Sequence, residues 1–315
     1  MKCLVTGAAG FIGSALIQRL ILEDHNIKGL YHTKKPRQQS TNVTYIKGDI
    51  TDKNSLKGII KDVDIIFHCA GIVNDYSSKD EYYNVHVNGT RNLIEECKTN
   101  SCKRFIYLSH IPYESNRKKH PYQKTKSLAE SLLLSEHKKN SFPSIIIRPG
   151  NVYGPNASTW VIRPLQAIKK NRIALINKGT GIFLHTYIDN LIDALILTMK
   201  KDDIEGEIFE ITDGDNTITW GKYLNDLSHI IGKGSINRSI PKPFALFLGK
   251  TMLFFYSITG IKPMITPSAV EIFSNSQTVS INKAQKVLNY NPKINYSQGM
   301  DNICRWVTEK GIENL

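Results

Sequence analysis

A glycine-rich turn between a strand pattern and a helix pattern is the feature that most restricts how this chain can fold. Residues 2–5 have the composition of a buried strand, and a helical pattern runs from Ser14. Between them, Gly7, Gly10 and Gly13 form the spacing G-x-x-G-x-x-G. A strand, a glycine turn and a helix in this order are typical of a dinucleotide-binding site.

Each glycine has a separate role in such a turn. Gly7 permits the tight turn out of the strand, Gly10 lets a pyrophosphate approach the backbone, and Gly13 lets the helix pack closely on the strand. The free N–H groups and the dipole at the start of the helix attract phosphates. We therefore expect Phe11 and Ile12 to join the three glycines in binding the cofactor.

The first 150 residues alternate strand patterns with helix patterns. The strand candidates are residues 2–6, 27–31, 43–47, 64–69, 104–109 and 144–148, and the helix candidates are 11–23, 53–60, 80–98 and 121–138. Alternation of this kind predicts a parallel sheet covered by helices on both faces. The predicted fold class is therefore α/β, with a Rossmann-type doubly wound parallel sheet.

After Pro149 the pattern loosens into short segments separated by glycine and proline. Helix candidates lie at 159–170, 189–200, 220–231 and 283–289, and a short strand is expected at 207–211. We expect a nucleotide-binding domain over residues 1–155, to which 186–200 return, and a smaller, mostly helical substrate-binding domain over 156–315. A ligand cleft is expected between the two domains.

Composition argues against several other classes of protein. The five cysteines are scattered without a C-x-x-C pair, so neither a disulfide framework nor a zinc site is expected, and no metal is predicted. Reduced cysteines fit a cytoplasmic protein. The net charge is +13, but no nucleic-acid-binding motif accompanies it, so nucleic acid is not an expected partner. No uninterrupted apolar run reaches the length of a transmembrane helix.

The stretch 244–261 is the nearest approach to such a run, and Lys250 interrupts it. Its composition suits the wall of a hydrophobic substrate pocket or a helix that lies at a membrane surface. It suits equally well a buried helix of the second domain. Peripheral contact with a membrane through this stretch is therefore an open expectation, which vesicle flotation of a Phe254→Glu, Phe255→Glu variant would test.

Tyr122 and Lys126 are four residues apart at the start of a predicted helix, so both side chains lie on one face. A tyrosine with a pKa of about 10 is a poor base at neutral pH. A lysine ammonium about 4 Å away would favour the phenolate by about 4 kcal/mol at an effective dielectric of about 20, or about three pKa units. Tyr122 could then exchange a proton with a substrate hydroxyl or carbonyl, while Lys126 holds the nicotinamide ribose.

Together these motifs resemble an extended short-chain dehydrogenase/reductase of the epimerase/dehydratase superfamily. Further segments match the family in order, at 48–52, 68–71, 89–93, 148–155 and 187–190, and the resemblance covers residues 1 to about 200. It implies a nicotinamide dinucleotide cofactor. The additional cofactor-binding residues that it implies are Asp49, Ile50, Ala70, Gly71, Pro149, Asn151 and Val152.

The C-terminal third is similar to the 3β-hydroxysteroid dehydrogenase branch of that family. The shorter matches lie at 210–215, 219–220, 265–267 and 283–292. This branch implies that an alcohol and a ketone are interconverted on a hydrophobic, steroid-like substrate, with Tyr122 as the acid and base. A nucleotide-sugar epimerase or dehydratase, and a non-catalytic cofactor-binding subunit, stay open. The family often dimerises through helices near 80–98 and 121–138, so the resemblance also implies a homodimer.

Two positions near the predicted catalytic residues depart from the family pattern. Ser109 matches the first serine after the strand, but His110 stands where the catalytic hydroxyl usually lies, so either residue could bind the reacting oxygen. The central-helix asparagine of the family aligns with His86, which leaves open any proton relay built on it.

Sugar-nucleotide enzymes of the family usually carry an arginine shortly before the segment at 187–190. This chain has Phe-Leu-His at 183–185, which weakens the epimerase interpretation, although Arg163 and Lys178 could bind a diphosphate instead.

The end of the second predicted strand bears on the choice between NAD and NADP. An acidic residue there binds the ribose 2′-hydroxyl of NAD, whereas a basic residue accommodates the 2′-phosphate of NADP. Residues 31–35 read Tyr-His-Thr-Lys-Lys and contain no carboxylate. His32 is therefore a predicted cofactor residue, and we expect an NADP preference. Comparable dissociation constants for NADPH and NADH would contradict it.

Overall fold

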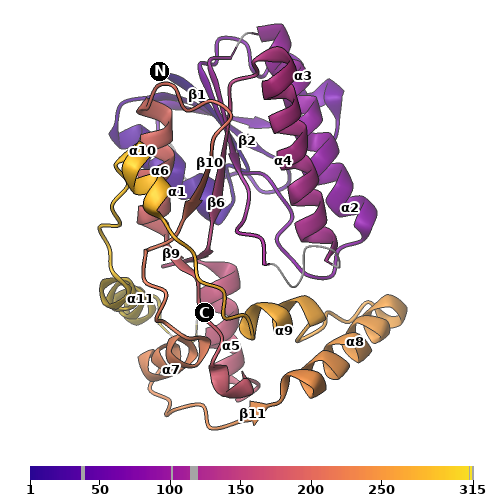
Figure 1. The fold of residues 1–315 in the computed structure, drawn as a ribbon, viewed down its shortest axis with the longest axis vertical. Helices are drawn as coiled ribbons and strands as arrows, with labels where there is room; N and C mark the ends of the chain where they lie inside the picture. The colour runs from indigo at the N-terminus through magenta and orange to yellow at the C-terminus, as the bar shows by residue number, and fades with distance from the viewer. Residues whose placement is uncertain (37–39, 101, 114–119, 312, 314–315) are drawn as a thin grey trace.

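A seven-stranded sheet forms the centre of the computed structural model, which describes residues 1–36, 40–100, 102–113, 120–311 and 313 (Figure 1). The strand order is β10-β6-β5-β4-β1-β2-β3, and every pairing in this sheet is parallel. Helices flank both faces of the sheet. The doubly wound parallel sheet predicted from the sequence is confirmed.

The strands of this sheet bring four carboxyl ends to one edge. Thr6 is paired with His68, and Leu108 with Ile147, so β1, β4, β5 and β6 end side by side. All residues of β4 and β5 are buried, as expected for central strands covered on both faces. The bounds are β1 Lys2–Thr6, β2 Asn26–Tyr31, β3 Val43–Lys47, β4 Ile65–His68, β5 Arg104–Leu108, β6 Ser144–Pro149 and β10 Ile208–Ile211.

Each face of the sheet has its own hydrophobic core. Leu16 and Leu191 belong to the core under α1 (Phe11–Leu22) and α6 (Ile188–Lys200). Leu93 and Leu133 belong to the other core, under the helices on the opposite face. Those helices are α2 Lys79–Tyr83, α3 Gly89–Asn100 and α4 Pro121–Asn140.

Three predicted helices differ from the observed elements. The pattern at 159–170 is divided between a π-helical turn at Ser158–Ile162 and α5 (Arg163–Lys169). Residues 53–60 form only a 3₁₀ turn at Lys53–Leu56, because Gly58 adopts a positive φ of 74° that a helix cannot continue. The pattern at 80–98 is divided between α2, a π-helical turn at Asn84–Asn88, and α3.

Helix α10 (Asn282–Leu288) packs against α6 and β10, and the remaining elements form a smaller, mostly helical part next to the carboxyl-end edge of the sheet (Figure 1). Two short parallel strand pairs, β7 with β9 and β8 with β11, accompany the helices. The bounds are β7 Asn151–Tyr153, α5 Arg163–Lys169, β8 Leu175–Ile176, β9 His185–Tyr187, α7 Trp220–Ile230, β11 Ser239–Ile240, α8 Lys242–Thr259, α9 Pro267–Phe273, α10 Asn282–Leu288 and α11 Tyr296–Lys310.

The strand expected at 207–211 belongs to the large sheet and not to the helical part. β10 pairs with β6, with Ile208 opposite Ile146, and forms one edge of the sheet. The sheet thus draws on residues from both sides of position 155, and the division into two domains at that position stays a prediction.

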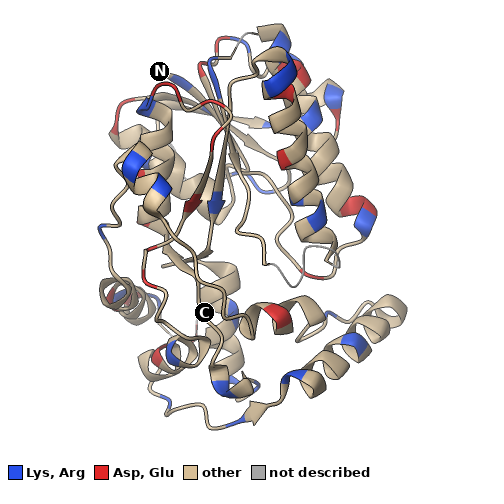
Figure 2. Cartoon of the chain, viewed as in Figure 1, with Lys and Arg blue, Asp and Glu red and all other residues tan. Residues whose placement is uncertain are grey.

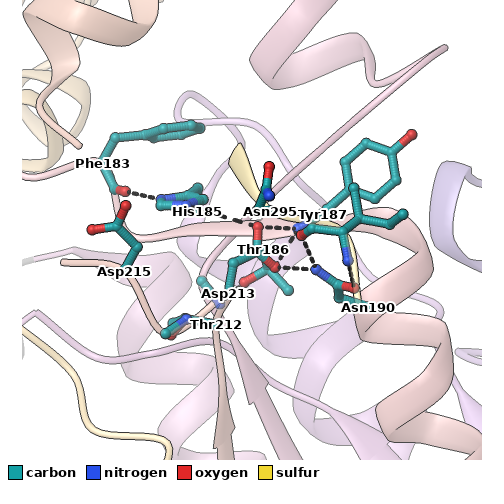
Figure 3. Close-up of polar contacts among 12 residues, drawn as sticks. Phe183, His185, Thr186, Tyr187, Asn190, Thr212, Asp213, Asp215 and Asn295 are labelled. Atoms are coloured by element: carbon teal, nitrogen blue, oxygen red, sulfur yellow. Dashed lines mark hydrogen bonds and ion pairs between the residues drawn. The ribbon is translucent and has the colours of Figure 1, made fainter. Parts of the chain in front are cut away.

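A buried hydrogen-bond network joins the segment after β10 to β9 and α6 (Figure 3). Asp213 accepts hydrogen bonds from the backbone N–H of Tyr187 at 2.9 Å and from Asn190 Nδ2 at 2.7 Å. His185 donates its Nδ1–H to the carbonyl oxygen of Phe183 at 2.9 Å, so its unprotonated Nε2 faces Asp213 Oδ2 at 3.9 Å. Burial raises the pKa of Asp213 to about 7 and lowers the pKa of His185.

Candidate active site

A single cavity of about 1130 Å³ opens at the carboxyl-end edge of the sheet and continues between the helices of the C-terminal part. It brings together every residue that the sequence assigned to cofactor binding or catalysis. The lining includes Gly7, Gly10, Phe11, Ile12, Gly13, His32, Asp49, Ile50, Ala70, Gly71, Ser109, His110, Tyr122, Lys126, Pro149, Asn151 and Val152. The role of each residue remains a prediction.

The glycine turn has the geometry that a pyrophosphate requires. Gly7 has a φ of 69°, and a Cβ on Gly7 would come within 2.9 Å of the backbone nitrogen of Ala70. A Cβ on Gly13 would lie 2.3 Å from the carbonyl oxygen of Gly7. Gly10 caps α1 without a side-chain hydrogen bond, and the first turn contains no acidic residue. The positive end of the helix is therefore free of a competing anion, and the turn fits a dinucleotide.

A chain of buried hydrogen bonds fixes the strand ends beside this turn. Thr6 Oγ1 accepts from the backbone N–H of Ala70 at 3.1 Å and donates to His68 Nδ1 at 2.8 Å. His68 Nε2 donates to Thr90 Oγ1 at 3.1 Å, and the Thr90 hydroxyl donates to the carbonyl oxygen of His86 at 2.6 Å. Burial lowers the pKa of His68 to about 3, so the ring is neutral. No local sequence pattern indicates these hydrogen bonds, because the residues that form them come from three separate elements.

Lys126 is placed differently from the expectation. Its Nζ donates to the carbonyl oxygen of Leu108 at 2.7 Å and lies 4.6 Å from the centre of the Tyr107 ring. Burial lowers the pKa of Lys126 to about 8. Burial also raises the pKa of Tyr122, and Asp75 adds to that rise. The expected lowering of the Tyr122 pKa by Lys126 is therefore wrong, because burial raises this pKa and no opposing effect of Lys126 accompanies it.

Four rings surround Tyr122 and make its environment poor in water. The ring centres of His110, His86, Tyr82 and His120 lie 5.1, 5.4, 6.1 and 6.4 Å from that of Tyr122. Sequence reasoning did not assign Tyr82 or His120 to the site. Since Tyr122 is protonated at neutral pH, its hydroxyl can donate a proton or a hydrogen bond to a bound oxygen.

His86 has a structural role in this arrangement. Its Nε2 accepts from the backbone N–H of Ile72 at 3.1 Å, and its Nδ1 donates to Thr125 Oγ1 at 2.9 Å. The Thr125 hydroxyl donates in turn to the carbonyl oxygen of Pro121 at 2.9 Å. Burial lowers the pKa of His86 to about 2. Both nitrogens are occupied and the ring is neutral, so His86 holds α4 against the loop after β4 and offers no free nitrogen for a proton relay.

Several buried polar atoms at this end of the cavity lack hydrogen-bond partners among the described residues. They are Ser109 Oγ, both ring nitrogens of His110, and Asn151 Nδ2. Burial, with a smaller contribution from Lys126, lowers the pKa of His110 to about 3, so its ring is neutral. Unpartnered buried polar groups are costly, and their position after β5 and β6 suits polar groups of a cofactor and a substrate. Ser109 and His110 both stay candidates for binding the reacting oxygen.

The opposite end of the cavity lies at the carboxyl end of β2. His32 and Lys34 line it, and His32 Nε2 lies 3.5 Å from Asp49 Oδ2. The strand end carries no carboxylate of its own, as the sequence indicated, but Asp49 brings one beside it from the loop after β3.

The part of the cavity formed by the C-terminal segments is mainly apolar. Its lining includes Trp160, Leu175, Ile176, Leu224, Ile240, Leu248, Met252, Ile265, Ile272 and Phe273. Arg163 and Arg172 also line it, and neither guanidinium has a hydrogen bond or ion pair with a described residue. Lys178, which could have bound a diphosphate, is absent from the described lining. Within the described residues, no group of His, Cys, Asp and Glu could hold a metal ion.

Comparison with protein families gives a match over residues 3–212 to the NAD dependent epimerase/dehydratase family. Similar curated proteins include the 2-alkyl-3-oxoalkanoate reductase of Stenotrophomonas maltophilia, 25% identical over 95% of this chain and 97% of that protein. The decarboxylating sterol-4-alpha-carboxylate 3-dehydrogenase of Saccharomyces cerevisiae is 26% identical over 97% of each chain.

Solved structures with the same fold include UDP-glucuronic acid 4-epimerase from Bacillus cereus in complex with UDP-glucuronic acid and NAD. It has a TM-score of 0.76 and 24% identity, with 99% of this chain and all of the other covered. UDP-glucose 4-epimerase from Thermotoga maritima has a TM-score of 0.79 and 19% identity, with coverage of 98% and 99%.

Proposed function

From the premise that the chain belongs to the NAD-dependent epimerase/dehydratase family of extended short-chain dehydrogenases and reductases, we propose that it interconverts a ketone and an alcohol on a hydrophobic substrate. The observation that carries this proposal is the continuity of one cavity, from the glycine turn past Tyr122 to the apolar lining of the C-terminal part. A dinucleotide and an apolar substrate could meet in this cavity beside Tyr122. Tyr122 is the tyrosine in the lining that the family pattern marks as catalytic.

The residues divide into cofactor-binding and proton-transferring groups. The glycine turn, together with Asp49, Ala70 and Asn151, would hold the dinucleotide, and the bound nicotinamide would supply or accept a hydride. Tyr122 donates a proton to the ketone oxygen during reduction. Ser109 or His110 donates a hydrogen bond to the same oxygen and orients it.

The proposed substrate class is a 3-oxo or 3-hydroxy carboxylic acid with large apolar substituents. By their names, the reductase and the sterol dehydrogenase to which this chain is similar both act on molecules with a carboxylate one carbon from the reacting position. The apolar lining suits the substituents, and the unpaired Arg163 and Arg172 suit the carboxylate. A neutral steroid is the alternative within the same reaction type.

Replacement of Tyr122 by Phe tests the proposed chemistry. We expect turnover of a long-chain 2-alkyl-3-oxoalkanoate to fall by about 10²-fold or more, because the proton donor is lost. Cofactor affinity, measured by fluorescence titration, should stay unchanged. Tyr45→Phe, which removes a hydroxyl outside the cavity lining, is the matched control and should retain activity. Undiminished turnover in Tyr122→Phe would reject the mechanism.

The same preparations distinguish the competing functions. Arg163 and Arg172 could also bind a nucleotide diphosphate, and the epimerase structures share the fold. Tightly retained NAD, with UDP-sugar conversion and no net change in NAD(P)H, would favour an epimerase. Clear cofactor binding without turnover of any ketone, alcohol or UDP-sugar would favour a non-catalytic subunit, which the unusual His110 keeps open.

We propose that NADP is the preferred cofactor, because His32 and Lys34 line the cavity at the end of β2. Lys34→Glu should weaken NADPH binding about tenfold, as expected for a lost charged hydrogen bond, and should leave NADH binding nearly unchanged. Isothermal titration with both cofactors measures the effect. Equal affinities of the wild type for the two cofactors would contradict the preference, and Asp49 would then be the residue that accepts the ribose hydroxyl.

A homodimer that pairs through α3 and α4 also stays a proposal from the family resemblance. The partly exposed Leu128 on α4 supports it, and analytical ultracentrifugation is the direct measurement.

A further inference from the structure

Helix α8 exposes a row of large apolar side chains to solvent. Phe247, Phe254 and Ile258 are exposed to 64%, 63% and 66%, and Phe244 and Phe255 are exposed beside them. The spacing of 247, 254 and 258 places these side chains on one face of the helix. A continuous apolar face of this kind indicates a binding surface, whereas single apolar residues scattered over a surface do not.

The charged residues of α8 itself are all lysines, and Lys242 at its start is paired with Glu271 of the neighbouring α9 at 2.7 Å. Residues 227–270 contain no Asp or Glu, whereas the same stretch contains Lys233, Arg238, Lys242, Lys250 and Lys262. Figure 2 shows the same arrangement, with α8 carrying blue positions and no red ones. An apolar face bordered by cations complements an anionic lipid surface. A second copy of the same face would bring like charges together, so this surface is poorly suited to self-association.

The inner side of α8 belongs to the cavity wall. Leu248 and Met252 line the cavity, and Ala245 and Gly249 are buried where the helix meets α9. A Cβ on Gly249 would lie 2.9 Å from the backbone nitrogen of Pro267, which shows how closely the helix approaches this part of the protein.

Two contacts also join α8 and its following loop to the nucleotide-binding part. The rings of Tyr76 and Tyr256 lie 5.2 Å apart, and Thr266 Oγ1 donates to Asp75 Oδ2 at 3.1 Å. The helix is therefore held in place across the cavity, with one side towards the cavity and the other towards solvent.

We propose that α8 docks in the plane of an anionic membrane surface, with Phe247, Phe254 and Ile258 inserted among the lipids. No helix of the described chain is long and apolar enough to cross a membrane, which agrees with binding in the interface. The cavity wall formed by Leu248 and Met252 then lies next to the lipid, so an apolar substrate enters the cavity from the bilayer. This route of entry rests on the proposed function, whereas the docking does not.

Flotation with vesicles tests the docking. The wild type should float with phosphatidylglycerol/phosphatidylcholine vesicles and lose most of its binding to pure phosphatidylcholine. Phe254→Glu/Phe255→Glu should reduce the vesicle-bound fraction about tenfold or more, because two apolar anchors become anions. Leu22→Glu/Thr41→Glu makes the same change of charge at exposed positions outside α8 and should float like the wild type.

Equal flotation of the α8 variant and the wild type would overturn the docking. Failure of the wild type to float would also overturn the docking. So would sedimentation without vesicles that shows a dimer of the wild type but not of the α8 variant. Circular dichroism and cofactor titration of the variant verify that it is folded.

Rates with two substrates test the route of entry. With a long-chain 2-alkyl-3-oxoalkanoate dissolved in anionic vesicles, the α8 variant should be at least about tenfold slower, while a short water-soluble analogue should be reduced at the wild-type rate. Equal rates on the vesicle-bound substrate would overturn the route and leave the docking intact. If the wild type reduces neither substrate, the proposed function is contradicted. The flotation experiment would still test the docking, because it does not depend on activity.

Discussion

At the scale of single residues, the direction of the pKa shift of Tyr122 bears on which direction of the proposed reaction it would serve. Burial among His86, His110 and Tyr82 raises that pKa, so the protonated hydroxyl predominates well above neutral pH. A phenol is ready to protonate a ketone oxygen. Oxidation of an alcohol needs the phenolate. Under the proposed function, the same environment would therefore favour reduction at neutral pH, and the rate of oxidation should increase as the pH rises.

Ser109 and His110 provide a direct test of which side chain orients the reacting oxygen. We expect Ser109→Ala to lower kcat about 10²-fold, as is typical for loss of one oxyanion donor. The double variant Ser109→Ala/His110→Ser should recover most of that loss, because it restores a hydroxyl at the adjacent position. Steady-state kinetics on a 2-alkyl-3-oxoalkanoate measures both effects. If Ser109→Ala is silent and His110→Ala is slow, His110 is the donor.

Local motifs were sufficient to predict the cavity-lining residues of the nucleotide-binding part, since each motif occupies the end of a strand or the start of a helix. The contacts that hold them in place could not be predicted in this way. The chain from Thr6 through His68 to Thr90 depends on packing between three elements. The pKa of Tyr122 depends on burial, which a four-residue spacing does not determine. The predicted lowering of the Tyr122 pKa by Lys126 was wrong for that reason.

At the scale of elements, the network around Asp213 connects β9, α6 and the segment after β10 (Figure 3). Asn190 extends it, since its Nδ2 also donates to the carbonyl oxygen of Ile294 at 2.8 Å. The carboxyl group of Asp213 is buried and its pKa is raised to about 7. The folded protein therefore binds the proton of Asp213 more tightly than the unfolded chain does.

Asp213→Asn should change how stability depends on pH. The Asp213 pKa is higher in the folded state, so its contribution is complete below the ordinary pKa of 3.8 and is lost as the pH rises to about 7. We expect the free energy of unfolding of the wild type to fall relative to that of Asp213→Asn across this range, in urea titrations at several pH values. Parallel curves for the two proteins would contradict the prediction.

Asp215→Asn is the matched control, because it removes a nearby carboxyl group whose pKa is lowered and not raised. The contribution of Asp215 is present above its ordinary pKa and is lost as the pH falls. The difference between Asp215→Asn and the wild type should therefore have the opposite dependence on pH.

Among the elements, those with clear periodicity were predicted well and those that depend on context were not. The strands of the large sheet and helices α1, α4 and α6 lie within a few residues of their predicted bounds. Residues 53–60 do not form the predicted helix, because Gly58 adopts a positive φ. The stretch at 244–261 was apolar enough to be buried or interfacial, and only the packing of α8 shows that one face is exposed.

At the scale of the whole molecule, the site exists because two parts of the chain meet over one edge of the sheet. The polar residues of the site follow the carboxyl ends of β1, β4, β5 and β6, and the C-terminal helices form its apolar lining. The alternation of strands and helices predicted the first part. The second part follows from long-range contacts such as the hydrogen bond between Thr266 and Asp75, which join segments far apart in the sequence.

The position of β10 at the edge of the sheet has a consequence for the order in which the protein is made. Its partner β6 ends at Pro149, but β10 begins only at Ile208. While a ribosome synthesises the residues between them, β6 is an unpaired edge strand, and such edges invite pairing with other chains. The nascent protein is therefore most exposed to aggregation during this interval, and a chain terminated within it would keep the unprotected edge permanently.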